Sequence, residues 1–204
     1  YSSGSGTTAL VFTTTVAEGD TDSSDLSVSS YGGTIADAAG GAAGAASGDL
    51  GTVTVDGDAP DFTSCTATDD TYGIGEALSI TCTWDEAVVT SDGTLTLSNS
   101  DTASYASGTG TTAIVFTTTI VEGDTDSSDL SVSSFGGTIA DSAGGAAGAA
   151  SGDLGAVIVD GDTPDITAIA ATDGDYSIGE VISITVTFDQ AVDVTSSPTL
   201  TLSN

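Results

Sequence analysis

The residues that could do chemistry in this chain are almost all carboxylates, and they occur in recurring groups. The sequence has thirty Asp and Glu residues and no Lys, Arg or His, which gives a formal net charge of −30. One group, GluGlyAspThrAspSerSerAspLeu, begins at Glu18 and recurs from Glu122. Its Asp-x-Asp-x-x-Asp spacing resembles a calcium loop, although it lacks the central Gly and the closing Glu of an EF-hand. Cation binding is therefore the first chemistry to consider.

The missing residue types exclude several classes of chemistry. Without His or Lys the chain has no Ser/His/Asp triad, no Cys/His pair, no P-loop Lys and no His-ligated zinc. A surface this negative repels nucleic acid and anionic membranes, and no apolar run has membrane-spanning length. Acid and base catalysis by paired Asp residues is disfavoured, because carboxylates duplicated in every copy fit metal binding better than a single active site. We expect no enzyme activity, no nucleic-acid partner and no membrane insertion.

An internal repeat organises these carboxylates. Tyr1 to Asp61 aligns without a gap on Tyr105 to Asp165, a spacing of 104 residues, and Phe62 to Asn99 continues onto Ile166 to Asn204 with one inserted residue. The repeat predicts three parts: residues 1–57 as the C-terminal half of an immunoglobulin-like repeat (strands D to G), 58–161 as a complete repeat, and 162–204 as the N-terminal half (strands A to C) of a following repeat.

Two interpretations of the half repeats stay open. They could be the cut ends of a longer array. Alternatively, the C-terminal half of one chain could complete the N-terminal half of the next, as in strand-complemented fibres.

Apolar residues at every second position predict short strands throughout the complete repeat. The segment 141–150 is rich in Ala, but its several Gly residues and its lack of an apolar stripe predict a loop. We expect an all-β protein of tandem immunoglobulin-like, Greek-key β-sandwich repeats of about 104 residues, arranged as beads on a rod. The predicted strands are Phe62 to Ala67 (A), Leu78 to Trp84 (B), Leu95 to Leu97 (C), Ala103 to Ala106 (D), Ile114 to Thr118 (E), Leu130 to Val132 (F) and Val157 to Val159 (G).

The two cysteines lie on strands expected to be antiparallel neighbours. Cys65 and Cys82 occupy positions where the other copy has Ile169 and Val186, so both positions belong to an apolar interior. We predict a disulfide, which would stabilise the fold by ~3 kcal/mol in the loop-entropy model and would indicate an oxidising, extracellular setting. The alternative is that both are reduced and act as small hydrophobic residues.

Strand direction places three groups of acids together where one repeat meets the next. The loop between strands E and F should lie beside the linker and face the end of strand B in the following repeat. The acids expected at the first junction are Glu18, Asp20, Asp22, Asp25, Asp56, Asp58, Asp61, Asp85 and Glu86. Those expected at the second are Glu122, Asp124, Asp126, Asp129, Asp160, Asp162, Asp165 and Asp189, joined by Asp69, Asp70 and Glu76 from the loop between strands A and B.

Calcium is the cation that best suits such junctions. Like charges would push neighbouring repeats apart, whereas Ca²⁺ takes roughly six to eight oxygen ligands and would turn repulsion into coordination. At the second junction Gln190 replaces Glu86, so one charged ligand is lost there. The alternative is that these acids are solvated loop residues of a protein from a saline habitat, with Asp and Gly serving only the turns.

Several phrases of the sequence also resemble a known family. They include AspGlyAspAlaPro at 56–60, TyrGlyIleGlyGluAlaLeuSerIleThrCysThrTrpAspGluAlaVal at 72–88, ThrLeuThrLeuSerAsn at 94–99, TyrAlaSerGlyThrGlyThrThr at 105–112 and GlyGlyThrIleAlaAspSerAlaGly at 136–144. Together they resemble the bacterial immunoglobulin-like, cadherin-like tandem repeats of very large secreted adhesins and cell-surface fibre proteins. The resemblance implies extracellular, calcium-stiffened rods whose ligands are among the acids named above. The total lack of Lys and Arg departs from that family.

Two functions follow from the sequence. The favoured one is a structural repeat of an extracellular fibre or adhesin, with divalent cations and neighbouring copies of itself, end to end, as partners. The alternative is a binding module for surface glycans or a protein, with stacking surfaces at Tyr1, Tyr31, Tyr72 or Tyr105. The replacement of Trp84 by Phe188 in the other copy suits core packing better than sugar stacking.

Overall fold

The chain forms β-structure only. The computed structural model describes residues 1–203, and this part of the chain has no helix and 38% of its residues in strands or isolated β-bridges. The prediction of an all-β protein is therefore confirmed. No helix that could cross a membrane occurs in residues 1–203. Asn204, the last residue of the predicted C-terminal half repeat, lies outside the described residues.

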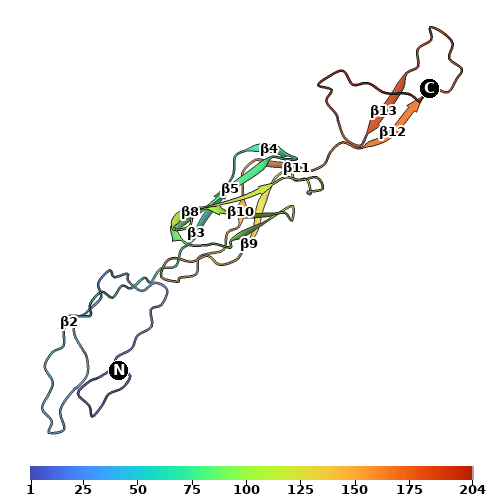
Figure 1. The fold of residues 1–204 in the computed structure, drawn as a ribbon. Helices are drawn as coiled ribbons and strands as arrows, with labels where there is room; N and C mark the ends of the chain where they lie inside the picture. The colour runs from blue at the N-terminus through green and yellow to red at the C-terminus, as the bar shows by residue number, and fades with distance from the viewer. Residues whose placement is uncertain (204) are drawn as a thin grey trace.

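Most of the strands lie in residues 58–161, which we call the middle part of the chain (Figure 1). Every strand predicted there is present, and β4 and β10 are additional. The segment 141–150 contains no helix, as predicted. The bounds are β3 (Phe62–Thr66), β4 (Asp70–Gly73), β5 (Ala77–Val88), β6 (Thr94–Leu97), β7 (Thr102–Ser107), β8 (Thr111–Thr119), β9 (Ser131–Gly136), β10 (Gly152–Asp153) and β11 (Val157–Asp160).

Seven of these strands form one sheet, and the other two, β4 and β11, pair with each other. The order across the main sheet is β10-β9-β6-β7-β8-β5-β3, and all its pairings are antiparallel. Outside this sheet, β11 pairs with β4 in parallel, with Val157 opposite Asp70 and Asp160 opposite Gly73. The last strand of the middle part is therefore joined directly to one of its first strands.

The longest strand, β5, shows why this sequence makes a sheet with one buried face. Leu78, Ile80, Cys82 and Trp84 are buried, whereas the residues between them are exposed or half-buried. A strand turns successive side chains to opposite faces, so this alternation places all four in one interior. β5 pairs with β3 on one side and with β8 on the other.

The apolar interior lies wholly within the middle part of the chain. Its buried members extend from Cys65 to Val159. Phe116 on β8 is completely buried and makes an edge-to-face contact with Phe135 on β9, with ring centroids 6.1 Å apart. Trp84 is also buried, and its indole N–H donates to the carbonyl of Gly148 at 3.0 Å. The tryptophan thus belongs to the core, as the comparison with Phe188 predicted.

The predicted disulfide is present between β3 and β5. Cys65 and Cys82 are direct cross-strand partners, their Cα atoms are 4.0 Å apart, and no free cysteine occurs in residues 1–203. Both side chains lie in the core.

The flanking parts differ from the middle part in burial. Residues 1–56 and 162–203 contain no buried residue. Their strands are β1 (Ser27–Val28), β2 (Gly48–Asp49), β12 (Ile166–Ala171) and β13 (Ile184–Phe188). Their backbone pairings nevertheless recur in the middle part at the spacing of the sequence repeat: the bridge from Ser23 to Val55 matches the one from Ser127 to Val159. Each flanking part therefore follows the path of half a repeat while leaving its apolar face open.

Candidate metal centre

The first junction is the chain segment 55–63, which joins residues 1–54 to β3. Two acids of the loop 17–22 accept hydrogen bonds from this segment. The Asp22 carboxylate accepts a hydrogen bond from the Gly57 N–H at 2.8 Å, and the Glu18 carboxylate accepts one from the Ala59 N–H at 3.4 Å. The backbone N–H of Gly19 also donates to the Gly57 carbonyl at 2.8 Å. The predicted neighbourhood of this loop and the linker is therefore present in the structure.

The other side of the first junction is fastened to the middle part of the chain. The Asp85 carboxylate accepts a hydrogen bond from the Asp61 N–H at 2.7 Å, and the Asp85 N–H donates to the Asp61 carbonyl at 3.1 Å. The Gly148 N–H donates to the Pro60 carbonyl at 2.9 Å. Residues 60 and 61 are thus held by hydrogen bonds to the end of β5 and to the loop after β9.

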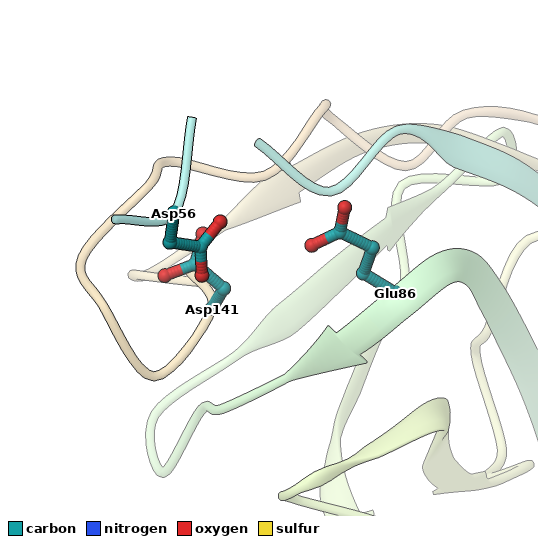
Figure 2. Close-up of side chains that lie close together, drawn as sticks. All are labelled: Asp56, Glu86 and Asp141. Carbon is teal, nitrogen blue, oxygen red and sulfur yellow. The ribbon is translucent and has the colours of Figure 1, made fainter. Parts of the chain in front are cut away.

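Three carboxylates from separate elements converge beside this linker (Figure 2). Asp56 comes from the linker, Glu86 from the end of β5 and Asp141 from the loop after β9, and each offers a ligand oxygen within 4.8 Å of the others. They form the single group of three or more potential ligands that is this close within residues 1–203. A hollow of about 220 Å³ lies at the same junction, bordered by Glu18, Asp56, Asp58 and Gly145 among others.

Asp141 is the member of the group whose environment most needs a cation. It is only 5% exposed. Its Oδ1 atom accepts hydrogen bonds from the backbone N–H groups of Ala143, Gly144 and Gly145, at 2.7, 2.6 and 3.0 Å. Its Oδ2 atom is buried and has no hydrogen-bond partner. A buried carboxylate oxygen without a partner is costly, so a cation at this position would supply the missing interaction.

The negative charges around Glu86 also favour the binding of a cation. Desolvation by its surroundings raises the pKa of Glu86, and the negative charges of Asp56, Asp85, Asp58 and Asp141 raise it further. A carboxylate among other carboxylates binds a proton more readily because the proton relieves repulsion. A divalent cation would relieve the same repulsion without protonation.

The geometry of the group fits Ca²⁺. Calcium–oxygen distances of about 2.3 to 2.6 Å mean that two ligand oxygens on opposite sides of the ion lie no more than about 5 Å apart. The separations within 4.8 Å meet this limit. Three carboxylates can supply three to six of the roughly six to eight oxygens that calcium takes, and water in the adjoining hollow can supply others.

Acidification is expected to stabilise the cation-free protein through Glu86. Because the folded-state pKa of Glu86 is raised, its charged form disfavours folding above that pKa, and this penalty is relieved as the pH falls through it toward the ordinary value. Urea unfolding in EDTA, followed by Trp84 fluorescence, should therefore give a higher midpoint at mildly acidic pH than at neutral pH. With calcium bound the trend should reverse, because protons compete with the cation.

Glu86→Gln is the matched control for this pH dependence, since Gln190 already occupies the equivalent position in the other copy. The variant should be more stable than the parent in EDTA at neutral pH and should gain less on acidification. An identical pH profile for parent and variant would contradict a role for Glu86.

The second junction, residues 159–167, repeats several contacts of the first. The Asp126 carboxylate accepts from the Gly161 N–H at 2.8 Å, and the Asp189 carboxylate accepts from the Asp165 N–H at 2.9 Å. The charge of Asp126 raises the pKa of Asp162, with desolvation and the charges of Glu122, Asp160 and Asp189 adding to the rise. Gln190, in place of Glu86, donates to the Asp162 carbonyl at 3.1 Å. Acids predicted for this junction are thus close enough to interact.

The remaining predicted ligands are not part of the close group. Asp69 and Glu76 are engaged within the middle part of the chain: their carboxylates accept from the N–H groups of Ala156 and Gly73, at 2.9 and 2.8 Å. Neither charge is among those that raise the pKa of Asp162. The others outside the group of three are Glu18, Asp20, Asp22, Asp25, Asp58, Asp61, Asp70, Asp85, Glu122, Asp124, Asp126, Asp129, Asp160, Asp162, Asp165 and Asp189.

Sequence reasoning missed Asp141 as a candidate ligand. Its neighbours Ser, Ala and Gly are typical of a turn, and a turn alone explains an Asp there. The signal that was available is its recurrence: Asp37 and Asp141 both precede a Gly-rich loop. Asp37 accepts hydrogen bonds from the backbone N–H groups of Gly41 and Ala39 in the same manner, and these two groups, Gly41 first, lower its pKa.

The fold and the site define an all-β, disulfide-linked and strongly acidic chain with a carboxylate cluster at a repeat junction. Comparison with protein-family models, with curated proteins and with solved structures gives no match. Any conclusion about function therefore depends on the residues and the geometry of this chain.

Proposed function

We propose that this chain is a structural segment of an extracellular fibre or adhesin, built from tandem immunoglobulin-like repeats whose junctions are stiffened by Ca²⁺. Two observations carry the proposal: the Oδ2 atom of Asp141 is buried without a hydrogen-bond partner, and the Asp141 carboxylate offers an oxygen within 4.8 Å of ligand oxygens on Asp56 and Glu86. A cation held there would tie the linker residue Asp56 to Glu86 and Asp141 of the repeat that follows it.

The pairing of strands supports the immunoglobulin-like part of the proposal. Sheet order places β3, β5, β8 and β7 side by side, followed by β6, β9 and β10, and β11 pairs in parallel with β4. Neighbours such as β5 and β8 are far apart in sequence, as in Greek-key sandwiches. The spacing of 104 residues between Tyr1 and Tyr105 in the sequence repeat is the reason to propose the same arrangement for the flanking parts.

The disulfide supports the extracellular part of the proposal. Structural disulfides persist in oxidising compartments and are rare where thiols are kept reduced. Cys65 and Cys82 link two strands of the core, so this bond is a structural disulfide.

The alternative of an aromatic binding module loses support at two of its four tyrosines, whereas Tyr1 is 65% exposed. Tyr72 and Tyr105 are half-buried and pack against the apolar core of the complete repeat. The hydroxyl of Tyr72 donates to the Thr68 carbonyl at 3.1 Å. Both rings therefore contribute to the packing of the core, which leaves less of each ring available for stacking on a sugar.

Calcium binding at the first junction is the test of this function. Calorimetric titration of the 204-residue chain with Ca²⁺ is expected to show binding, and Asp141→Asn is expected to weaken it about 10- to 100-fold, because the substitution removes the buried charged ligand. Small-angle X-ray scattering should show a narrower range of chain dimensions with Ca²⁺ than in EDTA.

Asp193→Asn is the matched control, because it makes the same charge change at an exposed residue in the C-terminal part of the chain. It should leave calcium affinity unchanged within about twofold. Trp84 fluorescence verifies that Asp141→Asn keeps the nearby loop in place, since the Trp84 indole donates to Gly148 in that loop. No binding heat at millimolar Ca²⁺, or equal affinity in both variants, would contradict the proposed function.

A further inference from the structure

Both junctions of the chain contain an Asp–Gly pair, Asp56–Gly57 and Asp160–Gly161. In each pair the Asp is exposed and the Gly is buried. Asp–Gly is the dipeptide most prone to backbone rearrangement, because glycine has no Cβ atom to hinder attack of its nitrogen on the preceding side chain. The segments that connect the repeats therefore contain a chemically reactive sequence.

The reaction available to an Asp–Gly pair is ring closure followed by hydrolysis. The Gly161 nitrogen attacks Cγ of Asp160, an N–Cγ bond forms, and the amide proton leaves with the carboxyl hydroxyl as water. Water then opens the resulting succinimide ring. Attack at Cγ restores Asp, whereas attack at the main-chain carbonyl breaks its bond to nitrogen and leaves isoaspartate, whose backbone continues through Cγ. Neither step needs a cofactor or an oxidant.

The loop 121–127 holds the nitrogen that would attack. The Gly161 N–H donates to the Asp126 carboxylate at 2.8 Å, and the Gly161 carbonyl accepts from the Gly123 N–H at 3.0 Å. The residue before Asp160 is held by the same loop, because both of its backbone groups form hydrogen bonds there as well. The reactive pair is therefore fixed on both sides.

Ring closure is incompatible with this geometry. The Gly161 nitrogen reaches Cγ of Asp160 only after rotation about the Cα–C bond of Asp160, and this rotation turns the N–H away from Asp126. The Gly161 backbone also lies against the loop, since a Cβ atom added to Gly161 would overlap the carbonyl oxygen of Asp124. The packing thus requires a glycine at this position, and it restrains the reactive pair that the glycine creates.

The first junction repeats this arrangement. A Cβ atom added to Gly57 would overlap the carbonyl oxygen of Asp20, and the Gly57 N–H donates to the Asp22 carboxylate at 2.8 Å. The Gly57 carbonyl accepts from the Gly19 N–H at 2.8 Å. The same dipeptide is thus held by the same contacts at two places in one chain.

We propose that Asp160–Gly161 and Asp56–Gly57 are sites of spontaneous isomerisation to isoaspartate, and that Asp126 and Asp22 are positioning residues that keep them unreacted. Each carboxylate holds the glycine N–H in an orientation that prevents ring closure. Opening of the loop releases the pair, so the rate of isomerisation is set by local opening of the junction. The linkers then change chemically as the chain ages.

Isomerisation at the first junction has a direct structural consequence. An isoaspartate adds a methylene group to the main chain and carries its carboxylate on Cα instead of on the side chain. The carboxylate of residue 56 would then leave its place beside Glu86 and Asp141. The inference itself depends on backbone chemistry and not on cation binding.

Ageing of the 204-residue chain in EDTA tests the proposal. After incubation for weeks at neutral pH, isoaspartate is located by electron-transfer fragmentation of the digested protein, which distinguishes it from Asp at each position. A synthetic peptide of residues 157–165 gives the rate of the unrestrained pair. Isomerisation at Asp160 in the folded chain is expected to be at least about 10-fold slower than in the peptide, because the pair reacts only when the loop opens.

Two reciprocal variants identify the residues responsible. Asp126→Ala removes one charge-assisted hydrogen bond, so it is expected to speed isomerisation at Asp160 about 10-fold and to leave Asp56 unchanged. Asp22→Ala is expected to speed isomerisation at Asp56 by a similar factor and to leave Asp160 unchanged. Each variant thus carries its own control at the other junction.

Three further variants separate positioning from a general loss of structure. Asp126→Asn keeps an acceptor oxygen and should restore most of the protection, and its own deamidation is recognised by the change in mass. Asp129→Ala makes the same charge change at a nearby exposed acid and should leave both rates unchanged within about twofold. Asp160→Glu should remove the signal at the second junction, because the longer side chain closes its ring much more slowly. Trp84 fluorescence verifies that each variant keeps the middle repeat folded.

The outcomes decide the role of the two carboxylates. Slower isomerisation in the chain than in the peptide, with each Ala variant acting only at its own junction, supports the proposal. The proposal is overturned if the parent chain reacts as fast as the peptide, if Asp126→Ala leaves the rate at Asp160 unchanged or changes both junctions equally, or if Asp129→Ala has the same effect. Because calcium is absent throughout, these results leave the calcium titration untouched, and a chain that binds no calcium is expected to isomerise in the same way.

Discussion

Phe116→Ala is expected to lower the free energy of unfolding of the middle repeat by about 3 to 5 kcal/mol. Phe116 is completely buried on β8 and packs edge-to-face against Phe135, so its removal leaves a cavity between two strands that neighbouring side chains cannot easily fill. Urea unfolding monitored by Trp84 fluorescence should report the loss as a lower midpoint with an unchanged slope.

The sequence repeat supplies an unusually close control for this substitution. Phe12→Ala removes the same side chain from the corresponding position, where it is 57% exposed. It should leave unfolding of the middle repeat within about 0.5 kcal/mol of the parent value. A similar loss in both variants would mean that the burial of Phe116 does not determine the stability of this repeat.

Loss of the disulfide is expected to lower the stability of the middle repeat by about 3 kcal/mol. The bond between Cys65 and Cys82 spans a sequence separation of 17 residues and restricts the unfolded chain. Because both cysteines are buried, the comparison requires protein unfolded and refolded in reductant, with unfolding then followed by Trp84 fluorescence.

Two results are needed to interpret that experiment. Reoxidised protein should recover the original midpoint, which excludes irreversible damage. Reductant added without unfolding should act slowly, because the buried sulfurs are accessible only after opening. A reduced protein as stable as the oxidised one would show that apolar packing, and not the covalent bond, holds β3 against β5.

Short-range patterns account for the parts of the fold that could be predicted. The alternation from Leu78 to Trp84 identified β5 and its buried face, and the apolar counterparts Ile169 and Val186 identified the setting of the two cysteines. The parallel pairing of β4 with β11 was not predicted, because it depends on contacts between residues such as Tyr72 and Val159 that are far apart in sequence.

The sequence predicted which segments meet at the candidate site, but not the complete set of its residues. Strand directions placed the acids of the linker and of β5 near each other, and Asp56 and Glu86 do meet. Asp141 was missed because its role arises from burial: three backbone N–H groups hold one of its oxygens and leave the other enclosed without a partner. Burial of a single loop residue depends on how that loop packs, which the sequence pattern does not specify.

The disulfide has a mechanical consequence for a chain used as a rod. Tension entering β3 from the N-terminal side passes at Cys65 through the sulfur atoms to Cys82, so residues 66–81 contribute no extensible length. β4 lies inside this shielded loop and pairs in parallel with β11, the strand that receives tension from the C-terminal side. A pull on β11 along its own direction loads all of its hydrogen bonds to β4 together in shear, and they cannot open one at a time.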